Sequence, residues 1–241
     1  MHTVAFIPAR KGSKGVPGKN KKLFAGKPLV QWSIEQAAAT KLFDHIFVSS
    51  DDPDVLQIAH DCKKLKVVPI DRCPTKMSKA DKNKLAGDNA DMDVVLYDFF
   101  GRKKNSCKYI CLLPPTSPLR SPEDIKAMYK FIKMDKYWTV VSVKWSDFIG
   151  WVEKPTNHGP LPTYNVDKRP NRQMRNDFFL ENGSIYWFKR DIFIPYGHMI
   201  ANPSKVKLYE MPAERSLEID TPFDFYLAEK AFEFTSMAKT S

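Results

Sequence analysis

A stretch near the start of the chain combines the residue types of a phosphate-binding loop. Residues 4–7 are apolar, and the loop of residues 8–20 contains Gly12, Gly15 and Gly18 among an arginine and three lysines. Glycine lets a backbone turn tightly and approach a ligand closely, and backbone N–H groups with basic side chains bind phosphate oxygens. The glycine spacing matches neither the dinucleotide-binding pattern nor the P-loop. The loop alone therefore leaves two interpretations, a polyphosphate site or a basic, solvated connection.

A second candidate for chemistry lies near the other end of the chain, where Glu218 and Asp220 flank Ile219. In an extended segment alternate side chains share one face, so both carboxylates would point the same way. Two carboxylates on one face can hold Mg²⁺ together with substrate phosphates. The alternative is that Glu218 points outward and Asp220 caps the helix expected after Thr221 and Pro222.

The first half of the chain predicts a sheet that would position the basic loop. Periodicity and turn residues predict strands at 4–7, 45–49 and 66–70 and helices at 29–39 and 53–64, the second helix being capped by Asp52. This strand–helix alternation favours a parallel sheet with right-handed crossovers. Open sheets of this kind bind ligands at the carboxyl ends of their strands, which is where residues 8–20 lie.

The rest of the chain continues the pattern, with two irregular stretches. We expect residues 71–84 to be irregular and polar, a helix at 88–100, a strand at 109–113, a helix capped by Ser121, strands at 138–143, 183–188 and 206–210, and a closing helix to about residue 234. The prolines within residues 114–118 would fix a rigid loop at a strand's carboxyl end. Residues 144–176 lack helical periodicity, which indicates hairpins and loops such as a partner-facing arm or lid.

The composition narrows the class of protein. The chain has 241 residues, a formal net charge of +10, and four cysteines without a CxxC pair. A positive charge suits nucleic acid or small anions, but the lysines are spread along the chain and no nucleic-acid motif is present, so we favour an anionic substrate. No apolar run reaches the ~18 residues of a membrane span. The sequence predicts an intracellular, cytoplasmic protein, with a nuclear location left open.

Four stretches in order resemble the CMP-sialic acid synthetases, also called acylneuraminate cytidylyltransferases. Residues 7–20 resemble the family's opening motif, and residues 112–120 (LLPPTSPLR) resemble its LLQPTSPLR segment. Residues 168–173 (KRPNRQ) and 181–186 (ENGSIY) are similar to the KRPRRQ and ENGSFY of animal members. Residues 216–220 (SLEID) resemble its SxDID. The resemblance covers residues 4 to about 230.

The resemblance implies a fold and an assembly. The fold is an α/β, three-layer α/β/α, Rossmann-like nucleotidyltransferase domain with a mostly parallel sheet, made of residues 1–143 and 178–241, with a small dimerisation subdomain inserted at residues 144–177. Members of the family are homodimers in which this arm reaches over the partner's active site. The resemblance implies no nucleic-acid or membrane partner.

The implied reaction joins CTP to a sialic-acid-like 2-keto sugar acid, N-acetylneuraminate or Kdn, and releases pyrophosphate. The anomeric hydroxyl attacks the α-phosphorus in line, so positioning and charge stabilisation do most of the work. By resemblance Arg10, Lys19 and Asp220 are catalytic, and Glu218 and Asp220 hold Mg²⁺. The implied nucleotide contacts are Arg10, Lys14, Lys19, Asn20, Arg72, Ser78 and Asp81, and the implied sugar contacts are Asn182, Tyr186, Arg169, Arg172 and Gln173.

Three departures from the family pattern leave alternatives open. Pro114 stands where the family has a glutamine that can hydrogen-bond the sugar, Glu218 replaces an aspartate, and residues 78–84 rewrite the segment that meets the cytosine. One alternative is the same chemistry on Kdo, pseudaminic or legionaminic acid. Another is a nucleotide-binding homologue with weak or no turnover. A nucleic-acid-binding protein, suggested only by the net charge, is the third.

Overall fold

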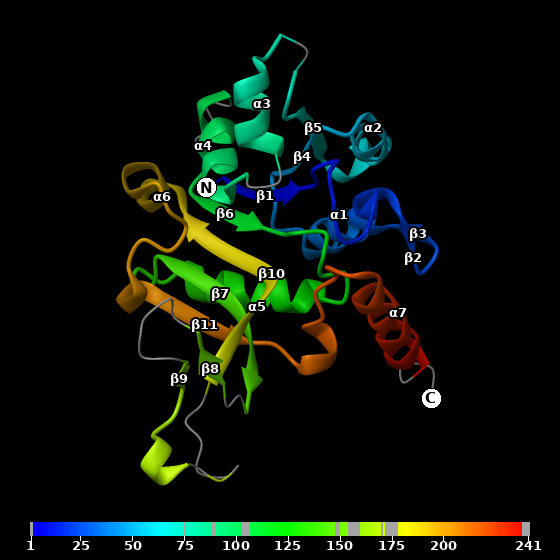
Figure 1. Ribbon diagram of the computed structural model, residues 1–241. Helices are drawn as coiled ribbons and strands as arrows, with labels where there is room; N and C mark the ends of the chain where they lie inside the picture. Colours follow the sequence, from blue (N-terminus) through cyan, green and yellow to red (C-terminus); the bar gives the residue numbers. More distant parts are fainter. Residues whose placement is uncertain are drawn as a thin grey trace.

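A seven-stranded sheet forms the centre of the computed structural model, which describes residues 2–74, 76–87, 90–102, 107–147, 150–153, 160–169, 171 and 178–237. The strand order is β11 (Val206–Glu210), β7 (Thr139–Ser146), β10 (Phe178–Lys189), β6 (Tyr109–Leu112), β1 (Thr3–Pro8), β4 (His45–Ser50) and β5 (Val67–Asp71) (Figure 1). β10 runs antiparallel to β6 and β7, and the other neighbouring strands are parallel. The predicted α/β class with a mostly parallel sheet is confirmed.

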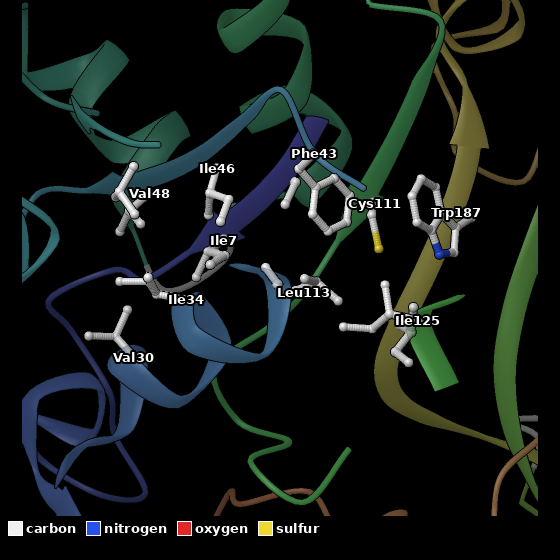
Figure 2. Packing of buried hydrophobic residues seen from close by; sticks show 14 of the residues in the cluster. Ile7, Val30, Ile34, Phe43, Ile46, Val48, Cys111, Leu113, Ile125 and Trp187 are labelled. Carbon is white, nitrogen blue, oxygen red and sulfur yellow. The ribbon is translucent and has the colours of Figure 1, made fainter. Parts of the chain in front are cut away.

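Helices cover both faces of this sheet and make three layers. One face carries α1 (Leu29–Thr40), α2 (Pro53–Asp61) and α5 (Pro122–Ile132), and the other carries α3 (Lys79–Ala86), α4 (Met92–Arg102) and α6 (Arg190–Tyr196). On the first face, Ile34 and Ile125 of the helices pack with Trp187 of β10, all of them fully buried (Figure 2). Burying each large apolar side chain contributes roughly 1.5–3 kcal/mol, so this packing fixes where the strand ends lie.

A third apolar cluster attaches the C-terminal helix. α7 (Pro222–Met237) packs against the hairpin of β2 (Leu23–Phe24) and β3 (Lys27–Pro28), with the ring of Phe24 edge-on to Phe225 and Phe232. Because residues 216–220 lead directly into α7, this cluster holds the acidic segment near the start of the chain. No helix in the described part of the chain, α7 included, is long and apolar enough to cross a membrane.

A short helix lies within the stretch that was expected to be irregular. α3 begins after Ser78, whose hydroxyl accepts from the Asp81 backbone N–H at 3.1 Å and donates to the Asp81 carboxylate at 2.7 Å. Hydrophobic periodicity missed this helix because Leu85 is its one buried residue. The prediction for residues 71–84 was therefore wrong in its second half, although the Ser-x-x-Asp capping pattern was present in the sequence.

The predicted arm leaves the sheet between two neighbouring strands. Ser146 of β7 pairs with Phe178 of β10, so residues 144–146, which the sequence assigned to the arm, belong to the main sheet. The described parts of the arm include the ribbon of β8 (Trp151–Val152) and β9 (Leu161–Pro162) and the turn Val166–Lys168, below the main sheet in Figure 1. These parts have the expected hairpin-and-loop character, and their role in dimerisation stays a prediction.

Candidate active site

A cavity of about 260 Å³ opens at the carboxyl ends of β1 and β6. Its lining includes Arg10, Lys19, Asn20 and Arg72, which are four of the predicted nucleotide contacts, and Asp220, a predicted metal ligand. The cavity lies at the edge of the sheet where open α/β folds bind ligands. The fold therefore brings the two ends of the chain to one site.

Lys19 joins the basic loop to the acidic segment. Its ammonium donates to the Ile219 carbonyl oxygen at 2.5 Å and lies 3.2 Å from Asp220 Oδ1. The lysine is almost fully buried, whereas Asp220 is exposed at the cavity. Lys19 thus fixes the backbone and the carboxylate of the acidic segment and also presents a positive charge to the cavity.

The close approach of the loop to this segment requires glycine at position 15. A Cβ on Gly15 would stand 1.8 Å from the Asp220 carbonyl oxygen, so a side chain there would push the two segments apart. Asn20 Nδ2 donates to the Arg10 carbonyl oxygen at 2.8 Å and closes the loop from the other side. Arg10 and Asn20 consequently line the cavity, whereas the exposed Lys14 is not part of the lining.

Glu218 has different surroundings from Asp220. Thr116 Oγ1 donates to Glu218 Oε1 at 3.3 Å, and both carboxylate oxygens would stand 2.5 Å from a Cβ at Gly183. Burial, and then the negative charge of Asp220, raise the pKa of Glu218 above its usual value. Because the Glu218 side chain is exposed, its carboxylate has the hydrogen bond from Thr116 and is otherwise open to solvent or to an added cation.

An irregularity in β10 creates the wall beside Glu218. The pairing of β10 with β7 shifts between Glu181 and Tyr186, and Gly183 within the shift has φ of +62°, a conformation that glycine adopts without strain. Ser117 Oγ donates to the Gly183 carbonyl oxygen at 3.3 Å. Such bulges re-aim backbone next to functional sites, and this one brings Gly183 to the loop after β6.

The interpretation of Asp220 as a helix cap is wrong. Asp224 Oδ2 accepts from the backbone N–H groups of Asp220 at 3.1 Å and Thr221 at 2.8 Å, and the Asp224 N–H donates to Thr221 Oγ1 at 3.2 Å. Thr221 and Asp224 therefore cap α7 reciprocally. The Asp220 carboxylate faces Lys19 instead.

Three other predicted nucleotide contacts have structural partners. Arg72 lines the cavity, but its guanidinium donates to Ser49 Oγ at 3.2 Å, to the Ser49 carbonyl at 2.9 Å and to the Leu85 carbonyl at 3.1 Å, and burial lowers its pKa to about 10. Ser78 and Asp81 cap α3 and are not among the lining residues. Their contacts with a nucleotide stay predictions.

Comparison with known proteins agrees with this fold and its motifs. A family model described as Cytidylyltransferase matches residues 4–236. The chain belongs to this cytidylyltransferase family. It is 30% identical over 232 residues to N-acylneuraminate cytidylyltransferase A of Danio rerio, covering 95% of this chain and 50% of that protein. It is 31% identical over 251 residues to CMP-N,N'-diacetyllegionaminic acid synthase of Legionella pneumophila, covering 99% of both.

Several of the relatives are longer than this chain. The chain spans about half the length of the fish and streptococcal N-acylneuraminate cytidylyltransferases that it matches. Two solved structures share its fold. CMP:2-keto-3-deoxy-manno-octonic acid synthetase complexed with CTP has a TM-score of 0.68 at 18% identity, covering 98% of this chain and 100% of that one. The 4-diphosphocytidyl-2C-methyl-D-erythritol synthase of Anaerococcus prevotii has 0.67 at 12%, covering 96% and 98%.

Asn182, a predicted sugar contact, is not among the residues that line the cavity. It is 3% exposed. Its Oδ1 accepts from Ser142 Oγ at 2.6 Å, and its Nδ2 donates to Ser216 Oγ at 3.0 Å. Both ends of the amide are therefore engaged by the protein, and this placement does not support a direct contact with the sugar.

The structure does not gather the other predicted sugar contacts at the cavity. Tyr186 donates its hydroxyl to Glu181 at 3.0 Å, and burial, followed by the charge of Glu181, raises its pKa. Arg169 lies in the arm, 5.8 Å from the centre of a tyrosine ring. Arg172 and Gln173 lie outside the described residues. This set stays a prediction.

Sequence analysis missed two residues that contact the acidic segment of this family member, Thr116 and Gly183. The Thr116 carbonyl accepts from the Ile219 N–H at 2.8 Å, in addition to the hydroxyl contact with Glu218. Both residues lie in stretches that carried the family resemblance. Periodicity gives no information about contacts between loops so far apart in the chain, so no local signal assigned them.

Glu218 and Asp220 are the residues of this family member that could hold a divalent cation. Within the described residues no group of three or more His, Cys, Asp or Glu side chains is placed to bind a metal, so the protein alone does not supply a full ligand set. Mg²⁺ is usually bound by one or two carboxylates, water and substrate phosphates. The exposed side chains of Glu218 and Asp220 leave carboxylate oxygens accessible to such a cation.

Proposed function

We propose that this chain transfers the cytidylyl group of CTP to a sialic-acid-like 2-keto sugar acid and releases pyrophosphate. The observation that carries the proposal is the contact of Lys19 with the acidic segment, 2.5 Å from the Ile219 carbonyl and 3.2 Å from Asp220, beside Arg10 in the cavity lining. Phosphate-binding cations and cation-binding carboxylates thus meet at one point, as nucleotidyl transfer requires. Membership of the cytidylyltransferase family supports the same reaction class.

In the proposed mechanism the chain positions charges around the triphosphate. Arg10 and Lys19 bind phosphate oxygens, and Glu218 and Asp220 hold Mg²⁺, whose chemistry is to neutralise the charge on the phosphates. Thr116 orients the Glu218 carboxylate through its 3.3 Å hydrogen bond. The sugar hydroxyl attacks the α-phosphorus in line, and the pyrophosphate leaves toward the basic loop, which stabilises its charge.

N-acetylneuraminate and Kdn are the sugars that we propose first. The fish relatives named N-acylneuraminate cytidylyltransferase support N-acetylneuraminate at 30 to 32% identity. The Legionella relative supports legionaminic acid derivatives as competing substrates, since it matches over 99% of both chains. Pro114 lines the cavity and offers the sugar no side-chain hydrogen bond, so a preference different from the glutamine-containing enzymes is consistent with this site.

We further propose a homodimer in which the arm of residues 144–177 contacts the partner and approaches its active site. The exposed fractions of Trp151 and Leu161 in the arm ribbon are 57% and 44%. Clustered exposed apolar side chains commonly mark an interface. Sedimentation velocity should show a dimer for the wild-type chain and a shift toward monomer for Trp151→Ser, and a monomeric wild type would contradict the proposal.

Pyrophosphate release tests the proposed reaction. The purified chain is incubated with CTP, Mg²⁺ and, one at a time, N-acetylneuraminate, Kdn, N,N'-diacetyllegionaminate and Kdo, with ATP, GTP and UTP in place of CTP as controls. We expect release with CTP and one class of sugar acid. CTP binding without release from any pair would point to the inactive homologue instead.

A further inference from the structure

A buried arginine in the connection between β6 and α5 begins a chain of hydrogen bonds. Arg120 is 2% exposed and donates to Gln36 Oε1 at 3.1 Å, to the hydroxyl of Ser33 and, from Nη1, to the Ser184 carbonyl at 2.7 Å. These three acceptors are neutral oxygens, although a buried cation is usually paired with a carboxylate. Through Ser184 this cation holds the irregular part of β10 that forms the wall beside Glu218.

The chain of hydrogen bonds continues across the sheet. The Ile185 N–H, which belongs to the same peptide unit as the Ser184 carbonyl, donates to Ser142 Oγ at 2.8 Å. Ser142 donates to Asn182 Oδ1 at 2.6 Å, so one hydroxyl on β7 binds both ends of the irregularity in β10. The side-chain amide of Asn182 is oriented by this contact, because Oδ1 accepts and Nδ2 must point the other way.

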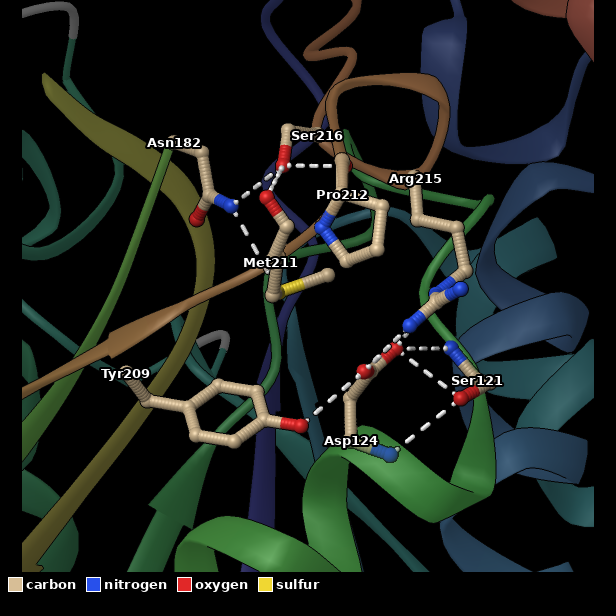
Figure 3. Close-up of polar contacts among 8 residues, drawn as sticks. All are labelled: Ser121, Asp124, Asn182, Tyr209, Met211, Pro212, Arg215 and Ser216. Carbon is tan, nitrogen blue, oxygen red and sulfur yellow. Dashed lines mark hydrogen bonds and ion pairs between the residues drawn. The ribbon is translucent and has the colours of Figure 1, made fainter. Parts of the chain in front are cut away.

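Asn182 connects this chain of hydrogen bonds to the acidic segment. Its Nδ2 donates to Ser216 Oγ at 3.0 Å and lies 3.4 Å from Met211 Sδ, and Ser216 Oγ donates to the Pro212 carbonyl at 2.8 Å (Figure 3). Ser216 is buried and stands two positions before Glu218. A displacement of Ser216 would therefore move the backbone that carries the two carboxylates.

We propose that Asn182 is a positioning residue, which holds Ser216 so that the carboxylates of Glu218 and Asp220 can share one divalent cation with the nucleotide. This inference rests on the proposed function and replaces the predicted sugar contact of Asn182. Outer-shell partners of metal ligands typically change metal affinity by about 10–100-fold when they are removed. The relevant quantity is therefore the gain in CTP affinity that Mg²⁺ produces.

The test compares Asn182→Leu, Ser216→Ala and the double variant. For each we measure the dissociation constant of CTP with Mg²⁺ and with EDTA, the KM of the sugar, and thermal unfolding. Thr139→Val is the matched control, because its buried hydroxyl donates to the Met199 carbonyl at 2.5 Å at the other end of β7. This control should lose a similar amount of stability without changing the gain in CTP affinity.

We expect each single variant to reduce the Mg²⁺-dependent gain about tenfold, with CTP binding in EDTA unchanged, and the double variant to reduce it no further, since both residues act through one contact. Additive effects, an unchanged gain, or a raised sugar KM alone would overturn the positioning role, and a raised sugar KM alone would restore the sugar contact. An equal loss in Thr139→Val would also overturn it. A wild-type chain without the gain and without pyrophosphate release would overturn the proposed function as well.

Discussion

Asp124 and Glu218 carry the same charge in opposite surroundings. Asp124 is 1% exposed and accepts from Arg215 Nε and Nη2 at 2.9 Å each, and from Ser121 N and Oγ at 2.9 Å each (Figure 3). Burial alone would raise the pKa of Asp124, but the hydrogen bonds from Arg215 and Ser121 outweigh burial and lower it. This carboxylate is satisfied by the protein itself.

Glu218 is the opposite case. Its hydrogen bond from Thr116 is long at 3.3 Å, and burial and the charge of Asp220 raise its pKa. A carboxylate with a raised pKa, next to Thr116 and Asp220 of the cavity lining, is a candidate for function, whereas a fully hydrogen-bonded buried carboxylate stabilises the fold. The comparison shows that the chain itself supplies the hydrogen-bond donors and the positive charge that Asp124 needs. We propose that an added cation does this for Glu218 and Asp220.

The largest effect is expected from removing Asp220, the member of the incomplete pair that lines the cavity. Asp220→Ala should lower the rate of pyrophosphate release by about 1,000-fold, the upper range for losing one transition-state contact. Thermal stability should change little, because Asp220 is exposed and its cap contacts come from the backbone N–H. The exposed, distant Asp135→Ala is the control. Full activity of Asp220→Ala would contradict the assignment of the Glu218–Asp220 pair to activity and of Asp124 to stability.

The satisfied carboxylate should show the reverse pattern. Asp124→Asn leaves Arg215 without its ionic partner, and breaking a buried pair typically destabilises by about 3–5 kcal/mol; because Arg215 is partly exposed, we expect the lower end in urea unfolding. The gain in CTP affinity produced by Mg²⁺ should fall less than in Asn182→Leu in the folded fraction, because Asp124 holds the side chain of Arg215 whereas Asn182 holds Ser216 directly. A stable Asp124→Asn protein that had lost this gain would contradict the division of roles.

A change in the loop tests whether the place of the incomplete pair depends on close packing. In Gly15→Ala the new Cβ would stand 1.8 Å from the Asp220 carbonyl oxygen, so the segments must separate. A misplacement of about 1 Å can lower the rate about 100-fold. Gly101→Ala is the control, because a Cβ there meets no atom within 4 Å. Equal kcat values for the two variants would show that the contact is not needed.

The smallest effect is the change in folding stability that we expect from neutralising Glu218, and this change depends on pH. Because the folded-state pKa of Glu218 is raised, ionisation above that pKa disfavours the folded state, and this penalty disappears as the pH falls through the raised value toward 4.5. Without Mg²⁺ or CTP, Glu218→Gln should therefore stabilise the chain at neutral pH by about 0.5 kcal/mol or less, because solvent screens the charge of this exposed side chain, and the gain should vanish in acid.

Asp124 gives the opposite sign over the same range. Its lowered pKa means that its contribution to stability is present above 3.8 and is lost as the pH falls further. Urea unfolding of the wild type and both variants between neutral pH and acid measures the two slopes. A Glu218→Gln variant that is less stable than wild type at neutral pH would show that the protein compensates this charge after all.

Much of the frame was predictable because it depends on local patterns. Apolar periodicity and caps such as Asp52 and Ser121 predicted the order of strands and helices, and the carboxyl-end rule predicted where the basic loop would lie. The helix α3 was missed because Leu85 is its one buried residue. The expectation that Glu218 and Asp220 lie on one face did not reveal that Thr116 contacts the first and Lys19 the second, since the sequence does not show which neighbours each side chain meets.

The amino-acid sequence by itself determined the α/β class, the basic loop, the acidic pair and the family, since each is written in residue types at short spacing. Only the tertiary structure decided that Gly15 touches Asp220, that Gly183 lies against Glu218, and that Asn182 is turned into the protein toward Ser216. The physical reason is that these contacts join segments far apart in the chain. Their geometry follows from the packing of the whole sheet and its helices, to which no local pattern refers.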